Sequence, residues 1–212
     1  MKLRSKKSDM NIQHYNEPFP YIVIDDYYDE KELEGIWEEL RFLCNPNKLG
    51  DKTSSASFTS TGGDKNILKN NVGVFLNTIY KEASHSNILT SLYKITDIYH
   101  DVFDSHPSWF FHYPSLTSDG CLLSYYEDGG YYKRHSDAAA ITMCAWFYEE
   151  PRKFTGGELT FSDYDVTCGL KNNRVVFFPS QIYHEVSLVK MKHSNLGKKL
   201  GRFCVTTFFN AA

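Results

Sequence analysis

A histidine and an aspartate separated by one residue, His135 and Asp137, are the first side chains in this 212-residue chain with clear potential for chemistry. If they lie on a strand, residues i and i+2 project from the same face, so the imidazole and the carboxylate can bind one metal ion. An isolated triplet of this kind is more often a surface pair, but this one stands in a longer pattern. The pattern comprises Tyr126-x-x-Gly129-x-x-Tyr132-x-x-His135-x-Asp137, the pair Gly156-Gly157, an apolar run over 174–179, Tyr183-His184 and a run that begins at Arg202.

This pattern resembles the iron(II)- and 2-oxoglutarate-dependent oxygenases, specifically their prolyl 4-hydroxylase-like branch, over residues 121–210. The opening PFPYIVIDDYYDE is similar to the first strand and helix of bacterial and phage members. The resemblance implies a dioxygenase that uses iron(II), 2-oxoglutarate and dioxygen, with ascorbate as a reductant. It implies hydroxylation of an unactivated C–H bond, by family resemblance in a peptidyl prolyl residue, with release of succinate and carbon dioxide. The alternatives are a free amino acid or another small molecule as substrate, and a cupin-like metal-binding protein without turnover.

The resemblance assigns the metal ligands to His135, Asp137 and His184. Two imidazoles and one carboxylate on one face of a metal leave three positions open, an arrangement diagnostic of non-haem iron(II) oxygenases. His184 is distant in sequence, but it follows an apolar run and a proline turn, so the sheet can bring it to the other two. The remaining histidines have no partner at ligand spacing, and we expect none of them in the site.

The distal carboxylate of 2-oxoglutarate needs a permanent cation deep in the barrel, and Arg202 is the candidate. A guanidinium is always charged and offers a planar fork to a carboxylate. Burial of an unpaired arginine would be very costly, and the alternative is an edge arginine on the surface. His184 and Arg202 are 18 residues apart, which is longer than usual in this branch. The extra segment, 190–201, makes Lys192 a competing anchor, and its lysines otherwise form a solvated turn near the mouth.

Two tyrosines, Tyr126 and Tyr132, occupy positions where family members line the cosubstrate and substrate pocket. A buried tyrosine hydroxyl needs a polar partner, and a carboxylate serves. Ring packing in the core is the alternative role, and a shift of one residue in strand register would exchange Tyr126 with Tyr125. Trp146 and Phe147 stand where some members carry a second cosubstrate-binding tyrosine, whose hydroxyl this sequence lacks.

The elements that must position these residues change character along the chain. We expect a polar tail over 1–16, a strand over 18–27 and an amphipathic helix over 29–44, with Asp29 and Glu32 as a capping pair. Further helical patterns cover about 67–83 and 87–103, and short aromatic or β-branched runs follow at 121–126, 139–148, 158–162, 174–178, 184–189 and 202–209. Helices followed by many strands predict an α+β fold.

The resemblance specifies this fold as a double-stranded β-helix, a jelly-roll, cupin-like core buttressed by N-terminal helices. A β-sandwich without chemistry is the alternative that the element order alone leaves open. We expect one oxygenase domain over 17–212, in which 17–108 supplies the first strand and helices and 109–212 the catalytic core. Residues 45–66 and 190–201 are candidate lids, since a long polar loop in a compact domain is usually functional or disordered.

Composition excludes several other classes of protein. The chain has 23 basic and 26 acidic residues, a net charge of −3, so we expect no duplex nucleic acid partner. No apolar run is long enough to span a bilayer, and we expect no membrane partner. The five cysteines are widely spaced and odd in number, which favours reduced, mostly buried thiols in a cytoplasmic protein. The expected partner is a peptide or a small molecule, bound by a monomer or weak homodimer.

Overall fold

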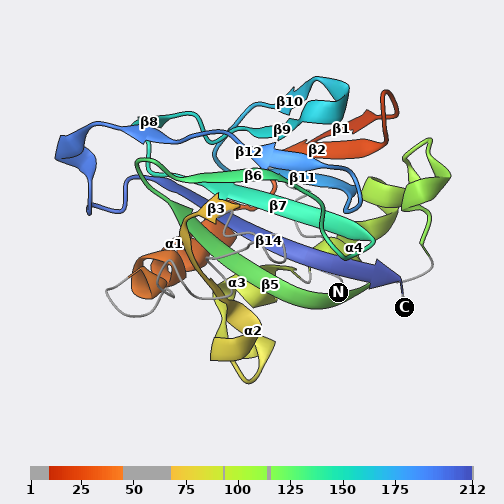
Figure 1. Ribbon diagram of the computed structural model, residues 1–212. Helices are drawn as coiled ribbons and strands as arrows, with labels where there is room; N and C mark the ends of the chain where they lie inside the picture. The colour runs from red at the N-terminus through yellow and green to blue at the C-terminus, as the bar shows by residue number, and fades with distance from the viewer. Residues whose placement is uncertain (1–9, 45–67, 93, 114–115, 212) are drawn as a thin grey trace.

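Two antiparallel sheets face each other in the computed structural model, which describes residues 10–44, 68–92, 94–113 and 116–211 (Figure 1). The larger sheet has the order β1 (Asn11–Tyr15), β2 (Tyr21–Asp25), β11 (Arg174–Pro179), β7 (Ile141–Phe147), β14 (Arg202–Ala211), β5 (Leu116–Tyr126) and β4 (Val72–Phe75). The smaller sheet has the order β10 (Val166–Cys168), β9 (Leu159–Phe161), β12 (His184–Val186), β6 (Tyr131–His135) and β3 (Lys69–Asn70). A separate ribbon pairs β13 (Lys190–Met191) with β8 (Phe154–Thr155). The predicted α+β class is confirmed.

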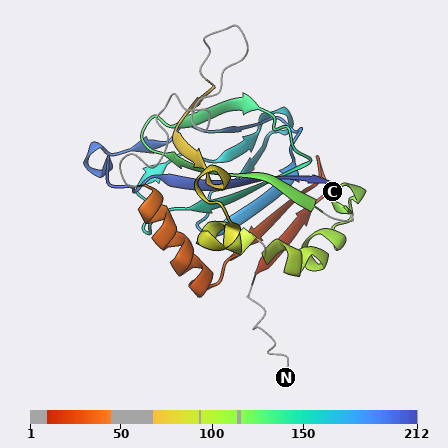
Figure 2. The same cartoon turned by 90° about the horizontal axis from the view of Figure 1, so that it is seen from below.

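The N-terminal helices lie side by side across the outer face of the larger sheet (Figure 2). They are α1 (Glu30–Leu43), α2 (Leu76–Ile79), α3 (Asn87–Leu92) and α4 (Lys94–Tyr99), with short turns η1 (Ala83–His85), η2 (His100–Asp104, π-helical) and η3 (Trp109–Phe111). Two more turns, η4 (Ser162–Tyr164) and η5 (His193–Asn195), belong to the strand-rich half. The helix predicted over 29–44 is confirmed together with its cap. The Asp29 carboxylate accepts from the Glu32 amide, and the Asp29 amide donates to the Glu32 carboxylate.

The larger sheet divides the apolar interior into two cores. One lies between this sheet and the helices, where Ile36 and Leu40 of α1 meet outer-face residues such as Phe147 and Phe203. The other lies between the two sheets and contains Tyr126 and Trp146, among others. Because side chains alternate along a strand, each central strand supplies both cores. The inner core is the one that surrounds the candidate site.

Two boundary predictions are wrong. The tail expected over 1–16 includes strand β1, because Asn11–Tyr15 pairs along its whole length with β2, although residues 1–9 lie outside the described part of the chain. The helix expected over 67–83 is replaced by β3, β4 and the four-residue α2, since sheet pairing with β6 and β5 outweighs the local periodicity. The helix expected over 87–103 is confirmed in its described residues, which form α3, α4 and the π-helical η2.

The remaining expectations for the chain divide between described and undescribed residues. The candidate lid 45–66 lies outside the described residues. The other candidate lid, 190–201, contains β13 and η5. All five cysteines are free thiols in the structure, and only Cys44 is not fully buried, which confirms that most of the thiols are buried. Within the described residues, no helix is long and apolar enough to cross a membrane.

Candidate iron and 2-oxoglutarate site

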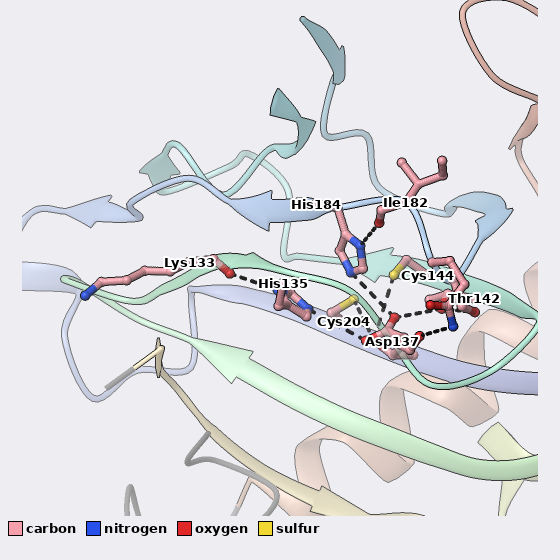
Figure 3. A network of polar contacts seen from close by, with 11 residues as sticks. Lys133, His135, Asp137, Thr142, Cys144, Ile182, His184 and Cys204 are labelled. Carbon is pink, nitrogen blue, oxygen red and sulfur yellow. Dashed lines mark hydrogen bonds and ion pairs between the residues drawn. The ribbon is translucent and has the colours of Figure 1, made fainter. Parts of the chain in front are cut away.

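Strand pairing in the smaller sheet brings the two predicted histidine ligands together. His135 is the last residue of β6, His184 is the first of β12, and the two residues are direct partners in the antiparallel register. Asp137 lies two residues beyond His135, where the chain leaves the strand. The potential ligand atoms of the three side chains all lie within 4.8 Å of one another (Figure 3). The Asp137 carboxylate is 3.7 Å from His135 Nε2 and 3.5 Å from His184 Nε2.

Both histidine rings are oriented by backbone carbonyl groups. His135 Nδ1 lies 2.8 Å from the Lys133 carbonyl oxygen, and His184 Nδ1 lies 2.9 Å from that of Ile182. A carbonyl only accepts, so each Nδ1 carries the proton and donates it. This tautomer leaves the Nε2 lone pairs free on the side that faces Asp137, as a metal ligand requires.

A pair of hydroxyl groups fixes the carboxylate, and sequence reasoning missed both. Thr142 Oγ1 donates to Asp137 Oδ2 at 2.7 Å and lies 2.8 Å from Ser180 Oγ. The Asp137 amide also donates to the Ser180 carbonyl at 2.9 Å. Thr142 and Ser180 are fully buried. Their residue types are too common to signal this role, and only the register of β7 beside β11 brings them to Asp137.

Burial also sets the protonation of His135. Desolvation, reinforced by the neighbouring His184, lowers the pKa of His135 from 6.5 to about 3. The ring is therefore neutral at physiological pH and can act as a metal ligand without first losing a proton. The donor set consists of two imidazoles and one carboxylate, which suits iron(II) with open coordination positions.

Tyr132 and Lys69 extend the site along the smaller sheet. The Tyr132 ring stacks on His135 with centroids 3.5 Å apart, so this predicted pocket residue lies beside a candidate ligand. Lys69 Nζ lies 5.2 Å from the centroid of the Tyr132 ring, and its residue is only 4% exposed. Burial lowers the pKa of Lys69 to about 8, with Asp137 opposing the shift. The sequence did not predict Lys69 as a site residue, because it lies where a helix was expected, 66 positions before His135.

Arg202 lies on the inner face at the start of β14, directly opposite Tyr126 of β5. It is 1% exposed, and its guanidinium carbon lies 4.8 Å from the centroid of the Tyr126 ring. Its Nε and Nη1 atoms have no hydrogen-bond partner among the described residues. Gly157 makes room for it, because a Cβ there would approach Arg202 Cδ to 2.9 Å and the backbone φ is +82°. A buried guanidinium with two free donors fits a carboxylate ligand.

The competing anchor Lys192 has a different environment. It is exposed and lines a surface groove of about 720 Å³ with other basic side chains of the β8–β13 ribbon, among them Lys153 and Lys190. An exposed lysine can keep its hydration shell, whereas Arg202 cannot. The geometry therefore favours Arg202 over Lys192 as the anion-binding residue.

Comparisons with known proteins agree with this geometry. Residues 121–210 match the family model described as the 2OG-Fe(II) oxygenase superfamily. A PKHD-type hydroxylase of Synechocystis, itself uncharacterized, is 35% identical over 86 residues, an alignment that covers 32% of this chain and 28% of that protein. The chain thus matches less than a third of the length of this relative.

Solved structures share the fold at low sequence identity. A viral collagen prolyl hydroxylase from Paramecium Bursaria Chlorella virus-1, in complex with 2OG, has a TM-score of 0.58 at 14% identity, with 91% of this chain and 96% of that chain covered. A Pseudomonas putida prolyl-4-hydroxylase has a TM-score of 0.59 at 13% identity, with 90% and 92% covered. These likenesses establish the jelly-roll fold.

The fold is a jelly roll, and residues 121–210, in its strand-rich half, match the model of the 2OG-Fe(II) oxygenase superfamily. The resemblance to this superfamily that the sequence pattern indicated is confirmed, and so is the predicted double-stranded β-helix with its buttressing helices. The family implies iron(II), 2-oxoglutarate and dioxygen, and a His-His-Asp cluster is present to hold the metal.

Proposed function

We propose that this protein is an iron(II)- and 2-oxoglutarate-dependent dioxygenase that hydroxylates an unactivated C–H bond, in a peptidyl prolyl residue, and releases succinate and carbon dioxide. One observation carries the proposal. A facial set of ligand atoms from His135, Asp137 and His184 shares the inner core with a buried guanidinium that has two free donors. A cupin-like protein that only binds a metal has no need for Arg202 in this position.

The side chains divide the work between metal and cosubstrate. His135, Asp137 and His184 would hold iron(II), and the guanidinium of Arg202 would hold the distal carboxylate of 2-oxoglutarate, beside the Tyr126 ring. Iron(II) and 2-oxoglutarate together supply the activation of dioxygen, with decarboxylation of the cosubstrate and hydroxylation of the substrate. The protein keeps the His135 imidazole neutral and excludes water from the Arg202 cation.

The substrate class rests on the relatives. Two solved structures of similar fold are a viral collagen prolyl hydroxylase and a bacterial prolyl-4-hydroxylase, and the curated relative is called a hydroxylase. A free amino acid or another small molecule is the second candidate. It is favoured by the fold shared with EctD of S. alaskensis, solved with 2-oxoglutarate and 5-hydroxyectoine, at a TM-score of 0.54.

The test starts with binding and ends with turnover. Anaerobic addition of iron(II) and 2-oxoglutarate should give a weak visible charge-transfer band, and aerobic incubation with ascorbate should release succinate. Proline-containing peptides and free amino acids are then screened by mass spectrometry for the gain of one oxygen atom. Oxygen gain in a peptide prolyl residue supports the first substrate class, and gain in a free amino acid supports the second.

A matched pair of variants controls the metal assignment. His184→Ala should abolish the band and succinate release, whereas His193→Ala, in the exposed turn η5, should leave both unchanged. An unchanged band in His184→Ala would remove the third ligand from the proposal. Absence of succinate release by the wild-type protein across all substrates would favour the cupin-like alternative.

A further inference from the structure

A second buried donor lies beside Arg202 and has no partner. Among the described residues, buried side-chain nitrogen and oxygen atoms without a hydrogen bond occur on Tyr27, Asn71, Trp146 and Arg202. Most buried polar groups in proteins are hydrogen-bonded, so each exception calls for an explanation. The indole Nε1 of Trp146 is such an exception, in a residue that is completely buried.

Strand register places Trp146 and Arg202 on the same inner face. Trp146 of β7 is the direct partner of Cys204 of β14, and Arg202 precedes Cys204 by two residues, so both side chains point between the sheets. The guanidinium carbon of Arg202 lies 5.8 Å from the centroid of the Trp146 ring. The two side chains that carry the unpartnered donors are therefore neighbours between the sheets.

The chemistry of these atoms specifies the kind of ligand that both could bind. An indole N–H only donates, and so do the N–H groups of a guanidinium. Their common ligand must accept hydrogen bonds from both, and it must be an anion because Arg202 brings a buried positive charge. A carboxylate meets both requirements, since its two oxygens can accept from two neighbouring donors.

We infer that the indole N–H of Trp146 is a second donor to the distal carboxylate of 2-oxoglutarate, beside Arg202. This inference rests on the proposed cosubstrate role of Arg202. Trp146 thereby becomes a cosubstrate-binding residue, and it selects a 2-oxo acid with a second carboxylate over one with an apolar end. The indole N–H of Trp146 would thus take the place of the tyrosine hydroxyl that some family members carry and that this sequence lacks.

The indole proton itself provides the readout. The chain has three tryptophans, so an ¹H–¹⁵N spectrum of the zinc(II)-loaded protein, which is diamagnetic, contains three indole signals. Trp146→Phe identifies the relevant one. We expect 2-oxoglutarate to move the Trp146 signal downfield and to slow its exchange with solvent, whereas 2-oxopentanoate, which lacks the distal carboxylate, should do neither. The signals of Trp37 and Trp109 should stay in place.

Calorimetry on the same zinc(II)-loaded protein measures the strength of the contact. Trp146→Phe should weaken 2-oxoglutarate binding by about ten- to a hundredfold, the range for one hydrogen bond to a charged group, and should change 2-oxopentanoate binding by less than about twofold. Trp37→Phe is the matched control, because Trp37 packs against Phe147 and Phe203 in the other core. It should leave both affinities unchanged.

Failures of the inference and of the proposed function are distinguishable. If 2-oxoglutarate binds but leaves the Trp146 indole signal unmoved, the inference is overturned and the role of Arg202 stands. Equal losses of both ligands in Trp146→Phe would show a packing role for the ring and would also overturn it. If the wild-type protein binds neither ligand, the proposed function and the inference fail together. Should Trp146→Phe not fold, Trp37→Phe and Trp109→Phe identify the Trp146 signal by elimination, and the comparison of the two ligands on the wild-type protein decides between the outcomes.

Discussion

Thr142→Val should weaken metal binding without touching any of the three ligands. The Thr142 hydroxyl donates to Asp137 Oδ2 at 2.7 Å, and valine keeps the shape of the side chain but not the donor. Loss of a group that orients a ligand typically lowers metal affinity by about 10–100-fold. This range corresponds to about 1.4–2.8 kcal/mol, in agreement with the 1.5–3 kcal/mol of a typical hydrogen bond to a charged group. Ser180 also loses a partner, so we expect a lower free energy of unfolding, by about 1–3 kcal/mol.

Thr207→Val is the matched control. Thr207 is also fully buried and lies on the neighbouring strand β14, but it faces the helix-side core. Among the described residues, its hydroxyl donates to Cys121 Sγ, at 3.8 Å. Anaerobic calorimetry with iron(II) measures the affinity, and urea unfolding measures the stability. The reasoning is refuted if Thr142→Val binds iron(II) within about twofold of the wild type, well below the expected range. It is refuted equally if Thr207→Val loses as much affinity as Thr142→Val.

Three further changes test the cation, the buried histidine and the sheet. Arg202→Leu should weaken 2-oxoglutarate binding by about 2–5 kcal/mol in calorimetry and leave iron(II) binding unchanged. Lys192→Leu should leave both unchanged, and a loss of 2-oxoglutarate binding in Lys192→Leu alone would assign the carboxylate-binding role to Lys192. The pKa of His135 is about 3 in the folded state and 6.5 ordinarily, so between these values the unfolded chain binds one more proton than the folded protein. The free energy of unfolding of the metal-free protein should therefore fall by about 2 kcal/mol on going from pH 7 to pH 5. His135→Gln should flatten this dependence in urea unfolding, and parallel curves would contradict the assignment. Asp25→Asn weakens the bidentate ion pair with Arg174 that joins β2 and β11. It should lower the free energy of unfolding by about 1–3 kcal/mol, a value between those typical of surface ion pairs and of buried ones. Asp163→Asn, in the exposed pair with Arg134, should change the free energy of unfolding little in the same assay.

The parts of the fold that the sequence predicted correctly are those with strong local signals. Asp29 and Glu32 mark the start of α1 by themselves, because both partners of a capping box lie within one turn. The spacing from His135 to Asp137 and the apolar run before His184 are likewise local. They place the candidate ligands near the ends of β6 and β12, where the register then joins them.

The parts that could not be predicted depend on contacts between distant segments. Residues 68–80 carry apolar side chains at helical intervals, but Val72 pairs with Tyr125 and Lys69 with Tyr132, more than 50 positions away. No local pattern reports such pairing, so the helix expected there was wrong and Lys69 was missed. Thr142 shares this limitation, since its role exists only after β7 and the 137–140 turn are assembled.

The junction of β3 and β4 has a mechanical consequence for the whole barrel. Asn70 is the last residue of a strand in the smaller sheet, Val72 is the first of a strand in the larger sheet, and only Asn71 separates them. A single residue spans a few ångströms, so the chain itself limits how far the two sheets can separate at this edge. This link ties the two sheets together at one edge, whereas β10 ends the smaller sheet at the opposite edge. We therefore expect any widening of the barrel to be smallest beside Asn71 and largest toward β10.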